Sequence, residues 1–546
     1  MRGVWIFCLV NLGLLAQQGP SQPNPLKPED LLGMERLSGL EFSPQERAQM
    51  MEDLFEQLQS YQALRKIPLP NGIAPAIGFQ PLLPESMKHL EKGPAQWSVV
   101  KQMKRPDNLE DLAYASVGTL AYLIRTRQVS STELTQMYLG RIKKYGPKLA
   151  CVISLLEDRA MEQAARADRE ITAGQYRGPL HGIPYGAKDL FAVKGTRTTW
   201  GAEPYKDQII DQTATVIERL DQAGAVLMAK LTLGALAWGD VWYGGKTLNP
   251  WNTEQGSSGS SAGSASATAA GLVAFSLGTE TWGSIVSPAS RCGVTGLRPS
   301  FGRVSRSGAM ALSWSMDKVG PICRYVEDCA VVFDAIRGTD GKDMSLVEAP
   351  FGYRSDLDLS QLRIGYLTFP AEGKERELAQ QVLADLEKIG AKPFPIKLPP
   401  ISAKPLSFIL SAEAAAVFDD LTRSNRDDLM TRQIKNAWPN VFRAARTIPA
   451  VEYIQANRAR TLLMQAMNQI MADVDVFVAP SFGDSLLLTN LTGHPCVVVP
   501  NGFSAENQPA SITFTAGLFD EARLLAVARA YQQATPHHLK RPPSFP

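Results

Sequence analysis

One stretch decides how this chain folds: GSSGSSAGSASATAAGLVAFSLGTETWGSIVSPASRCGVTG, residues 256–296. Its first half is dominated by Gly and Ser and, taken alone, would suit a flexible linker. Its second half does not, because the apolar run Leu272–Leu277 leads into Trp282-Gly283-Ser284, where a glycine beside a serine favours a tight turn. Such a turn opens a serine hydroxyl and nearby backbone N–H groups to a ligand, which indicates a nucleophile rather than a linker.

The composition is that of an ordinary globular protein. The chain has 546 residues, of which 45% are hydrophobic and 20% charged, and its net charge at pH 7 is +2. This length exceeds the roughly 250–300 residues at which single cores usually stop growing, so we expect a large catalytic domain with an appendage. The sequence has no long run of Lys or Arg, so we do not expect nucleic acid as a partner. The expected partner is a small-molecule substrate.

The histidines and cysteines give no reason to expect a metal or another cofactor. The five histidines have no metal-ligand spacing beyond the adjacent pair His537-His538. Cys323 and Cys329 could pair, but so sparse a set of cysteines favours buried free thiols. We therefore expect no metal site and no cofactor.

The N-terminus is laid out like a signal peptide. Gly3–Leu15 is apolar and, at about 13 residues, shorter than the roughly 20 that a membrane helix needs. We interpret residues 1–20 as a signal peptide, which predicts export to the periplasm or beyond the cell and no stable membrane span; the alternative is a buried helix. Residues 21–96 are expected to form a helical and irregular appendage, and 97–546 the catalytic domain, with about 400–472 as a possible cap region.

Helical and strand-like patterns alternate along most of the chain. In the appendage, Ser43 and Glu46 form a capping-box pattern that predicts a helix start. Short apolar strands separated by helices predict an α/β fold with a mixed sheet. Helices are expected at 117–126, 131–145, 157–173, 213–223, 374–389 and 521–533, and strands at 179–188, 225–229, 362–367, 393–396, 474–479 and 496–500.

A serine nucleophile needs a base, and the sequence offers two kinds. A Ser-His-Asp triad is disfavoured, because only His181 and His494 lie near glycine-rich turns and no Gly-x-Ser-x-Gly elbow precedes an evident helix. Lys188 ends an apolar segment, where burial would lower its pKa and leave some neutral amine near pH 7. The alternative for Lys188 is a structural ion pair with Asp189 or another carboxylate.

The order of these residues resembles the amidase signature family, whose members share a serine, a second serine in a cis peptide and a lysine. The spacing from Ser260 to Ser284 equals that between the family's bridging serine and its nucleophile, which favours Ser260 over Ser257 as the bridge. The resemblance covers about 106–534 in family order. Three segments carry it: LHGIPYGAKD at 180–189, NPWN at 249–252 followed by GSSAGS at 259–264, and GTETWGSI at 278–285.

The resemblance implies a large mixed sheet covered by helices on both sides, and a role for each residue of the site. Lys188 would accept a proton from Ser260, which relays one from Ser284 as that serine attacks a carbonyl carbon. Ser261 would support this network. The oxyanion would be held by the backbone N–H groups of Thr281, Trp282, Gly283 and Ser284.

Two residues depart from the family's usual Gly-Gly-Ser-Ile-Arg at the nucleophile. The indole of Trp282 removes a positive-φ option, and Val286 removes a charge beside the nucleophile. Aromatic residues in flanking segments suggest an apolar or aromatic acyl pocket, with ordinary core packing as the alternative. The pocket candidates are Trp238, Trp242, Tyr243, Trp282 and Trp314, with Trp200 nearby.

Three functions are compatible with this pattern. The favoured one is an exported amidase that hydrolyses a linear non-peptide amide to acid plus ammonia or amine through a Ser284 acyl-enzyme. The first alternative is the glutamine-hydrolysing A-type subunit of a tRNA-dependent amidotransferase, which the signal peptide and the apolar pocket disfavour. The second is a catalytically impaired binding protein of the same fold. The oligomeric state is left open.

Overall fold

The computed structural model describes residues 23–75, 77–82, 90–100, 102–369 and 372–546. The predicted signal peptide lies outside these residues. The described residues up to Pro70 form one compact unit, and those from Asn71 to Pro546 form a second. The predicted boundary at 96/97 and the predicted cap at 400–472 stay predictions, because this division does not test them.

The N-terminal unit contains two helices, α1 (Leu31–Ser38) and α2 (Pro44–Leu64). Ser43 Oγ accepts a hydrogen bond from Glu46 N at 3.3 Å, and Glu46 Oε2 accepts one from Ser43 N at 2.7 Å. This is the capping box predicted from the sequence. An ion pair of 2.7 Å between Arg47 and Glu35 joins the two helices.

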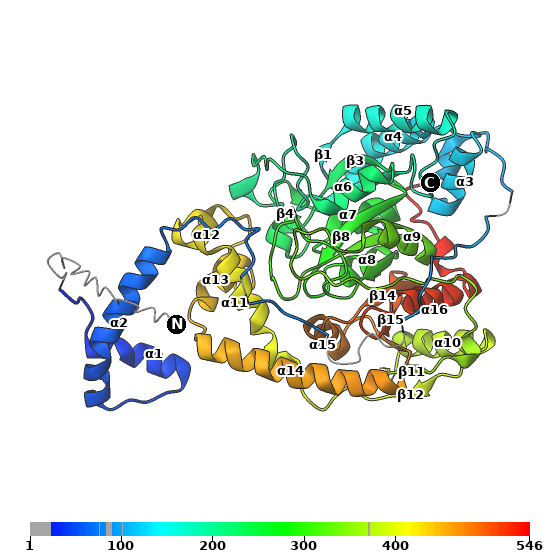
Figure 1. The fold of residues 1–546 in the computed structure, drawn as a ribbon. Coiled ribbons are helices and arrows are strands. Elements are labelled where there is room, and N and C mark those ends of the chain that lie inside the picture. The colour runs from blue at the N-terminus through cyan, green and yellow to red at the C-terminus, as the bar shows by residue number, and fades with distance from the viewer. Residues whose placement is uncertain (1–22, 76, 83–89, 101, 370–371) are drawn as a thin grey trace, which may run out of the picture. The chain divides into compact units, whose positions relative to one another are not determined.

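The second unit is organised around a mixed sheet of 11 strands (Figure 1). Along the sheet the strands follow the order β1-β3-β2-β8-β10-β9-β14-β15-β13-β11-β12. The pairs β2/β3, β2/β8, β11/β12 and β11/β13 are parallel, and the other neighbours are antiparallel. The strands are β1 (Val152–Leu155), β2 (Pro184–Lys188), β3 (Val226–Leu231), β8 (Phe275–Glu280), β9 (Thr295–Arg298), β10 (Lys318–Cys323), β11 (Ile364–Tyr366), β12 (Phe394–Pro395), β13 (Val476–Pro480), β14 (Cys496–Phe503) and β15 (Pro509–Ala516). Two small hairpins pair β4 (Val241–Trp242) with β5 (Gly245–Lys246), and β6 (Leu248–Asn249) with β7 (Asn252–Gly256).

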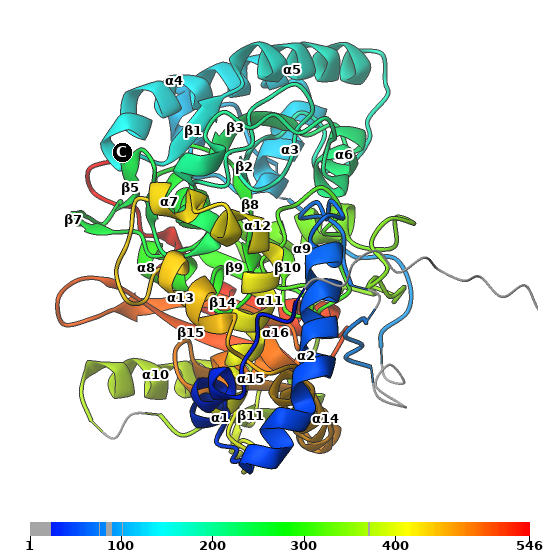
Figure 2. The same ribbon diagram turned by 90° about the vertical axis from the view of Figure 1, so that its left-hand side faces the viewer.

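The helices α3, α4, α5, α6, α10 and α16 of this unit lie close to the expected segments, whereas α7, α8, α9 and α15 were not predicted. In Figure 1, α4 and α5 lie side by side, and Figure 2 shows α11, α12 and α13 together as a separate group. The helices are α3 (Val117–Arg125), α4 (Ser131–Leu149), α5 (Glu157–Thr172), α6 (Thr215–Gln222), α7 (Ala262–Ala269), α8 (Val286–Cys292), α9 (Val326–Ile336), α10 (Lys374–Lys388), α11 (Phe408–Val417), α12 (Asp419–Arg423), α13 (Trp438–Ala445), α14 (Ala450–Asp473), α15 (Asp484–Thr492) and α16 (Glu521–Ala534).

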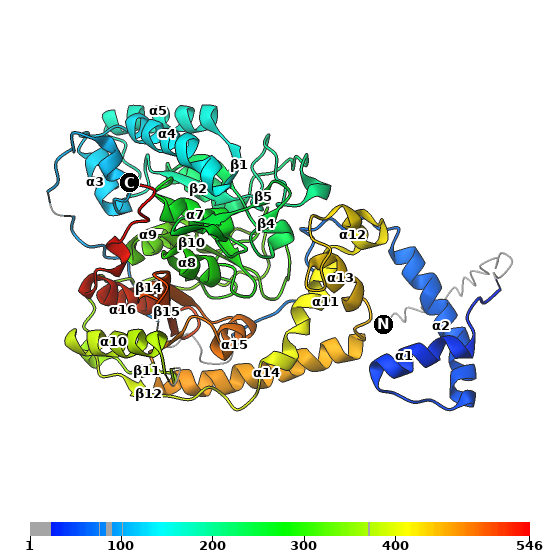
Figure 3. The same ribbon diagram turned by 180° about the vertical axis from the view of Figure 1, so that it is seen from behind.

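Helices cover both faces of the sheet, as β14 shows. Successive side chains of a strand point to opposite faces. Cys496 and Val498 belong to a cluster with α7 and α8, whereas Val497 and Val499 pack in the main core with α16 (Figure 3). The predicted α/β fold, a large mixed sheet between helices, is therefore confirmed.

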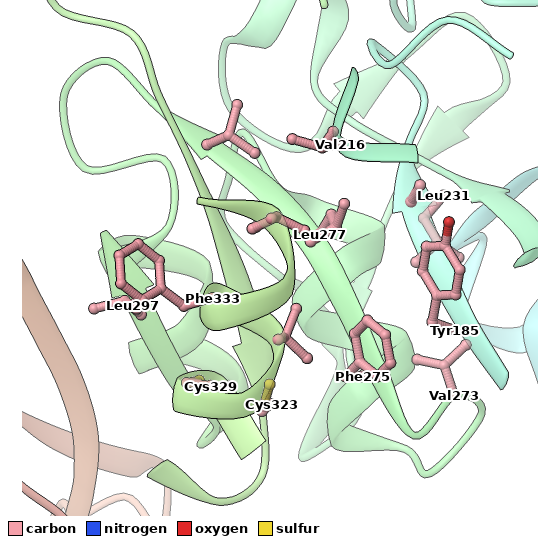
Figure 4. Packing of buried hydrophobic residues seen from close by; sticks show 14 of the residues in the cluster. Tyr185, Val216, Leu231, Val273, Phe275, Leu277, Leu297, Cys323, Cys329 and Phe333 are labelled. Carbon is pink, nitrogen blue, oxygen red and sulfur yellow. The ribbon is translucent and has the colours of Figure 1, made fainter. Parts of the chain in front are cut away.

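Core packing at the centre of the sheet positions the end of β2. Tyr185 on β2 stacks on Phe275 of β8, with ring centroids 5.0 Å apart (Figure 4). Cys323 and Cys329 lie in the same core as free buried thiols, so they do not pair. Along the described part of the chain, no helix combines the length and apolar character needed to cross a membrane.

Candidate active site

Lys188 is the last residue of β2, and its side chain is fully buried. The ammonium nitrogen lies 2.8 Å from Ser260 Oγ, 3.1 Å from Ser261 Oγ and 2.8 Å from Thr279 Oγ1. Burial lowers the pKa of Lys188 to about 7, against the opposing effect of the Asp317 and Glu280 charges. About half of the molecules would therefore carry a neutral amine near pH 7.

The ion pair considered as an alternative for Lys188 involves a different lysine. Asp189 lies 2.7 Å from Lys230, and both side chains are fully buried. Asp189 Oδ2 also accepts hydrogen bonds from the backbone N–H and the hydroxyl of Thr199. Asp189 thus fixes the chain just beyond β2. It pairs with Lys230, so the Lys188 amine contacts the hydroxyls of Ser260 and Ser261.

The Gly/Ser segment is closely packed backbone, with no room for larger side chains. The peptide bond between Gly259 and Ser260 is cis, as the resemblance implied. A Cβ on Gly259 would lie 1.8 Å from the carbonyl oxygen of Gly239, and one on Gly263 would lie 2.4 Å from that of Cys151. These contacts explain why a stretch that resembles a linker forms the buried helix α7 instead.

Ser284 lies on a turn between β8 and α8, where only 9% of it is exposed. Its backbone carbonyl accepts a hydrogen bond from Ser261 N at 3.1 Å, which ties the turn to the Gly/Ser segment. Within the described residues, the backbone N–H groups of 281–284 donate to no protein acceptor. Gly283 adopts φ +82, whereas Trp282 does not have a positive φ, so the indole causes no backbone strain.

Glu280 anchors this turn, a role that the sequence reading missed. Its carboxylate is fully buried and accepts hydrogen bonds from Ile285 N and Val286 N, the first turn of α8, at 2.8 and 2.9 Å. Its other oxygen pairs with Arg298 and with Asn490 Nδ2, each at 2.8 Å. Burial alone would raise the pKa of Glu280, but the Arg298 charge and these hydrogen bonds hold it at about 2. The sequence does contain a signal for this role, because Glu280 is an acidic residue within the segment that carries the nucleophile.

The start of the turn, at Thr281, is held by Asp317. Thr281 Oγ1 donates to Asp317 Oδ1 at 2.6 Å, and Leu312 N and Ser313 N donate to its second oxygen. Ser313 Oγ in turn donates to Glu413 on α11 at 2.6 Å. A helix within the predicted cap region therefore contributes to the shape of the turn around Ser284.

The aromatic pocket candidates do not form one cluster. Of the five, Trp242 and Tyr243 are in ring contact, with centroids 4.9 Å apart, and Trp242 is only 8% exposed. Trp282 is 47% exposed on the turn beside Ser284. The guanidinium of Arg432 lies over Trp238, 4.4 Å from the ring centroid, so a charged group covers that face. Trp314 is half-buried between Ser313 and Ser315.

A cavity of about 1040 Å³ begins at Ser287, close to the turn, but Lys188, Ser260 and Ser284 are not among its lining residues. Ser287 Oγ lies 2.7 Å from Ser258 Oγ, so the cavity and the Gly/Ser segment share a wall. The site is instead defined by the hydrogen bonds of Lys188 with Ser260 and Ser261 and by that of Ser261 N with the Ser284 carbonyl.

Comparisons with known proteins show the family of this chain. A family model described as Amidase matches residues 133–487. The chain belongs to the amidase signature family. It is a hydrolase of amide C–N bonds.

Two curated relatives are glutamyl-tRNA(Gln) amidotransferase A subunits. The protein from Marinomonas sp. (strain MWYL1) is 34% identical over 478 residues, which cover 78% of this chain and 98% of that protein. The protein from Methylococcus capsulatus (strain ATCC 33009 / NCIMB 11132 / Bath) has the same identity and coverage. Among solved structures, the peptide amidase of Stenotrophomonas maltophilia matches with a TM-score of 0.72 and 31% identity, over 80% of this chain and 99% of that one.

These relatives contradict the favoured function, an exported amidase of linear non-peptide amides, and favour the alternative of an A-type amidotransferase subunit. The physical reason lies in the supposed apolar pocket. Trp242 is buried against Tyr243, and a guanidinium covers the face of Trp238. The aromatic residues therefore do not argue against a polar substrate. Export itself stays a prediction.

Proposed function

We propose that this chain is the glutamine-hydrolysing subunit of an amidotransferase, which releases ammonia from the glutamine side chain through an acyl-enzyme on Ser284. The observation that carries this proposal is the 2.8 Å contact between the buried Lys188 amine, whose pKa is lowered to about 7, and Ser260 Oγ. The similarity to A subunits is the reason for proposing glutamine as the substrate. It is also the reason for proposing partner subunits, which would deliver the ammonia to an aminoacyl-tRNA.

The proposed reaction begins with two proton transfers. Neutral Lys188 takes the Ser260 hydroxyl proton while Ser260 takes that of Ser284, and Ser284 Oγ bonds to the carboxamide carbon. The carbonyl oxygen becomes an oxyanion at the free N–H groups of 281–284, where each donor is worth about 2.7–4 kcal/mol of transition-state stabilisation. The relay then returns a proton to the departing nitrogen as the C–N bond breaks and ammonia leaves.

The second half of the reaction repeats the relay with water. Water gives a proton to Ser260, Lys188 holds the proton that Ser260 passes on, and the water oxygen bonds to the acyl carbon. The ester bond to Ser284 breaks, the serine regains its proton, and glutamate leaves. Ser261 holds the arrangement through its contacts with Lys188 Nζ and the Ser284 carbonyl, at 3.1 Å each.

The test is ammonia release from glutamine by the purified full chain, alone and after co-purification with any partner subunits. We expect release that is lost in Ser284→Ala and in Lys188→Met. A folded wild-type protein that releases no ammonia from glutamine with its partners present would contradict the proposal. Because tRNA partners are not exported, this function also requires residues 1–20 to be retained, and N-terminal sequencing that finds them cleaved would count against it.

A peptide amidase is the second candidate, and one observation favours it: the solved peptide amidase matches 99% of its own length with a TM-score of 0.72. Release of ammonia from a C-terminal peptide amide at a higher kcat/KM than from glutamine would favour this candidate. Both candidates use the same residues around Ser284, so the choice between them depends on what contacts the rest of the substrate.

A further inference from the structure

Glu413 on α11 is a buried carboxylate whose hydrogen bonds converge on one short turn. Its Oε2 accepts from Ser313 Oγ at 2.6 Å and from Ser315 N at 3.0 Å. Its Oε1 accepts from Ser315 Oγ at 2.6 Å and from Tyr453 Oη, on α14, at 2.8 Å. Burying a carboxyl group costs stability unless hydrogen bonds compensate, and three of these four donors belong to residues 313–315. Glu413 therefore holds this turn more than any other part of the chain.

Helix α14 holds the same turn through a second buried side chain. Arg460 is 1% exposed, and its guanidinium donates to Ser315 Oγ and to the Ser315 carbonyl, each at 2.9 Å. Inside the turn, Asp317 N donates to the Ser313 carbonyl at 3.0 Å. The position of residues 313–317 therefore depends on α11 and α14.

Asp317 carries this position to the residues beside the nucleophile. Its Oδ2 accepts from Ser313 N at 3.0 Å, and its Oδ1 accepts from Thr281 Oγ1 at 2.6 Å. Thr281 is the first of the four residues whose backbone N–H groups face the proposed oxyanion. Three consecutive contacts, from Glu413 to Ser313, from Ser313 to Asp317 and from Asp317 to Thr281, thus connect α11 to the turn around Ser284.

We propose that Glu413 is a positioning residue for the backbone donors of 281–284, which it holds in place through Ser313, Asp317 and Thr281. The inference rests on the proposed role of these donors, and it does not depend on the choice of glutamine as the substrate. An oxyanion donor acts when charge develops on the carbonyl oxygen, so Glu413 affects the rate of attack by Ser284. Glu413 takes no part in the proton transfers.

The test follows the labelling of Ser284 in the full chain by a fluorophosphonate, whose phosphoryl oxygen uses the same donors as a substrate carbonyl. The rate constant of labelling reports on folded molecules, whereas the final extent of labelling reports on how much protein is folded. Glu413→Ala should lower the rate constant about 10²-fold, the effect of a displacement of about 1 Å. A merely structural role would lower the extent alone.

Glu413→Gln is the conservative variant and should retain most of the rate. Its amide oxygen can still accept from Ser313 Oγ and Ser315 N, and the hydroxyls of Ser315 and Tyr453 can accept from its NH₂ group. Labelling of Glu413→Gln that is as slow as that of Glu413→Ala would contradict positioning by hydrogen bonds.

A double-mutant cycle tests the route from Glu413 to the oxyanion donors. Thr281→Val removes the hydroxyl that contacts Asp317 and leaves the Thr281 N–H in place. If Glu413 acts through this contact, the double variant should label within about threefold of the slower single variant, whereas independent effects would multiply. Multiplying effects would overturn the inference. If Glu413→Ala yields no folded protein, Ser313→Ala takes its place in the cycle, because it removes the hydroxyl that joins Glu413 to this route.

Asp427→Ala is the matched control, because it removes another buried carboxylate from the 400–472 region. Its partner Arg443 keeps a second aspartate, Asp428, at 2.8 Å. This variant should label at the wild-type rate. A folded Glu413→Ala protein that also labels at the wild-type rate would overturn the inference and leave the proposed function standing. A folded wild-type protein in which Ser284 is not labelled would contradict both.

Discussion

Replacing Glu280 by Gln should disable hydrolysis by misplacing the turn around Ser284, although Glu280 itself has no place in the reaction. The carboxylate holds the first turn of α8 through Ile285 N and Val286 N at 2.8 and 2.9 Å, and it is the charge partner of the fully buried Arg298 at 2.8 Å. The amide of Gln presents N–H where an acceptor is needed and removes the negative charge. The Arg298 guanidinium would then be buried without a countercharge.

The expected magnitude follows from these contacts. Removing one partner of a buried ion pair costs about 3–5 kcal/mol of stability. Glu280 also contributes to stability through its pKa, which is about 2 in the folded protein against an ordinary value of 4.5 for a glutamate. This contribution is complete above pH 4.5 and is lost as the pH falls towards 2, because the unfolded state takes up the proton first. A displacement of about 1 Å at the turn would lower kcat about 10²-fold.

The assay compares Glu280→Gln with Glu521→Gln, a matched change in another fully buried arginine–carboxylate pair, that of Arg303 and Glu521. Urea unfolding should show a loss of stability in both variants. Only Glu280→Gln should lower kcat for ammonia release, and only it should remove the Glu280 contribution to acid unfolding. A folded Glu280→Gln protein with wild-type kcat would refute the reasoning about this anchor.

Two further predictions concern the base and the indole. Because Lys188 must be neutral and its pKa is lowered to about 7, kcat/KM should rise with pH through about 7 and level off above it, falling about tenfold per pH unit on the acid side. A flat profile from pH 5 to 9 would show that Lys188 is not the base. Trp282→Ala should leave kcat for glutamine within about threefold, since the oxyanion donor is the backbone N–H rather than the ring. A loss of about 10²-fold would place the indole itself in the reaction.

The sequence was most informative where local pattern and family order agree. The strand that ends at Lys188 and the helix that starts at Ser131 were both predicted and lie where expected. β15 was not predicted, because its residues PASITFTA mix small and polar types, although it forms a hairpin with the preceding strand β14. The roles of Lys188, Ser260 and Ser284 stay predictions that the geometry supports.

What the sequence could not supply were contacts between distant segments. Glu280 lies next to the nucleophile motif, but its partners Arg298 and Asn490 come from other elements, so its role emerges only in three dimensions. Arg432 shows the same limit, because nothing in its local sequence indicates that it stacks on Trp238. The prediction of an aromatic acyl pocket rested on residue type alone. Residue type does not distinguish an aromatic side chain that lines a ligand site from one that packs in the core.

The most direct test of the central claim is to trap the acyl-enzyme. Wild-type protein mixed with glutamine and quenched in acid during turnover should yield, by peptide mass spectrometry, a γ-glutamyl ester on the peptide that contains Ser284. Ser284→Ala should yield no adduct and release no ammonia. An adduct on a different residue, or undiminished ammonia release by Ser284→Ala, would contradict the account.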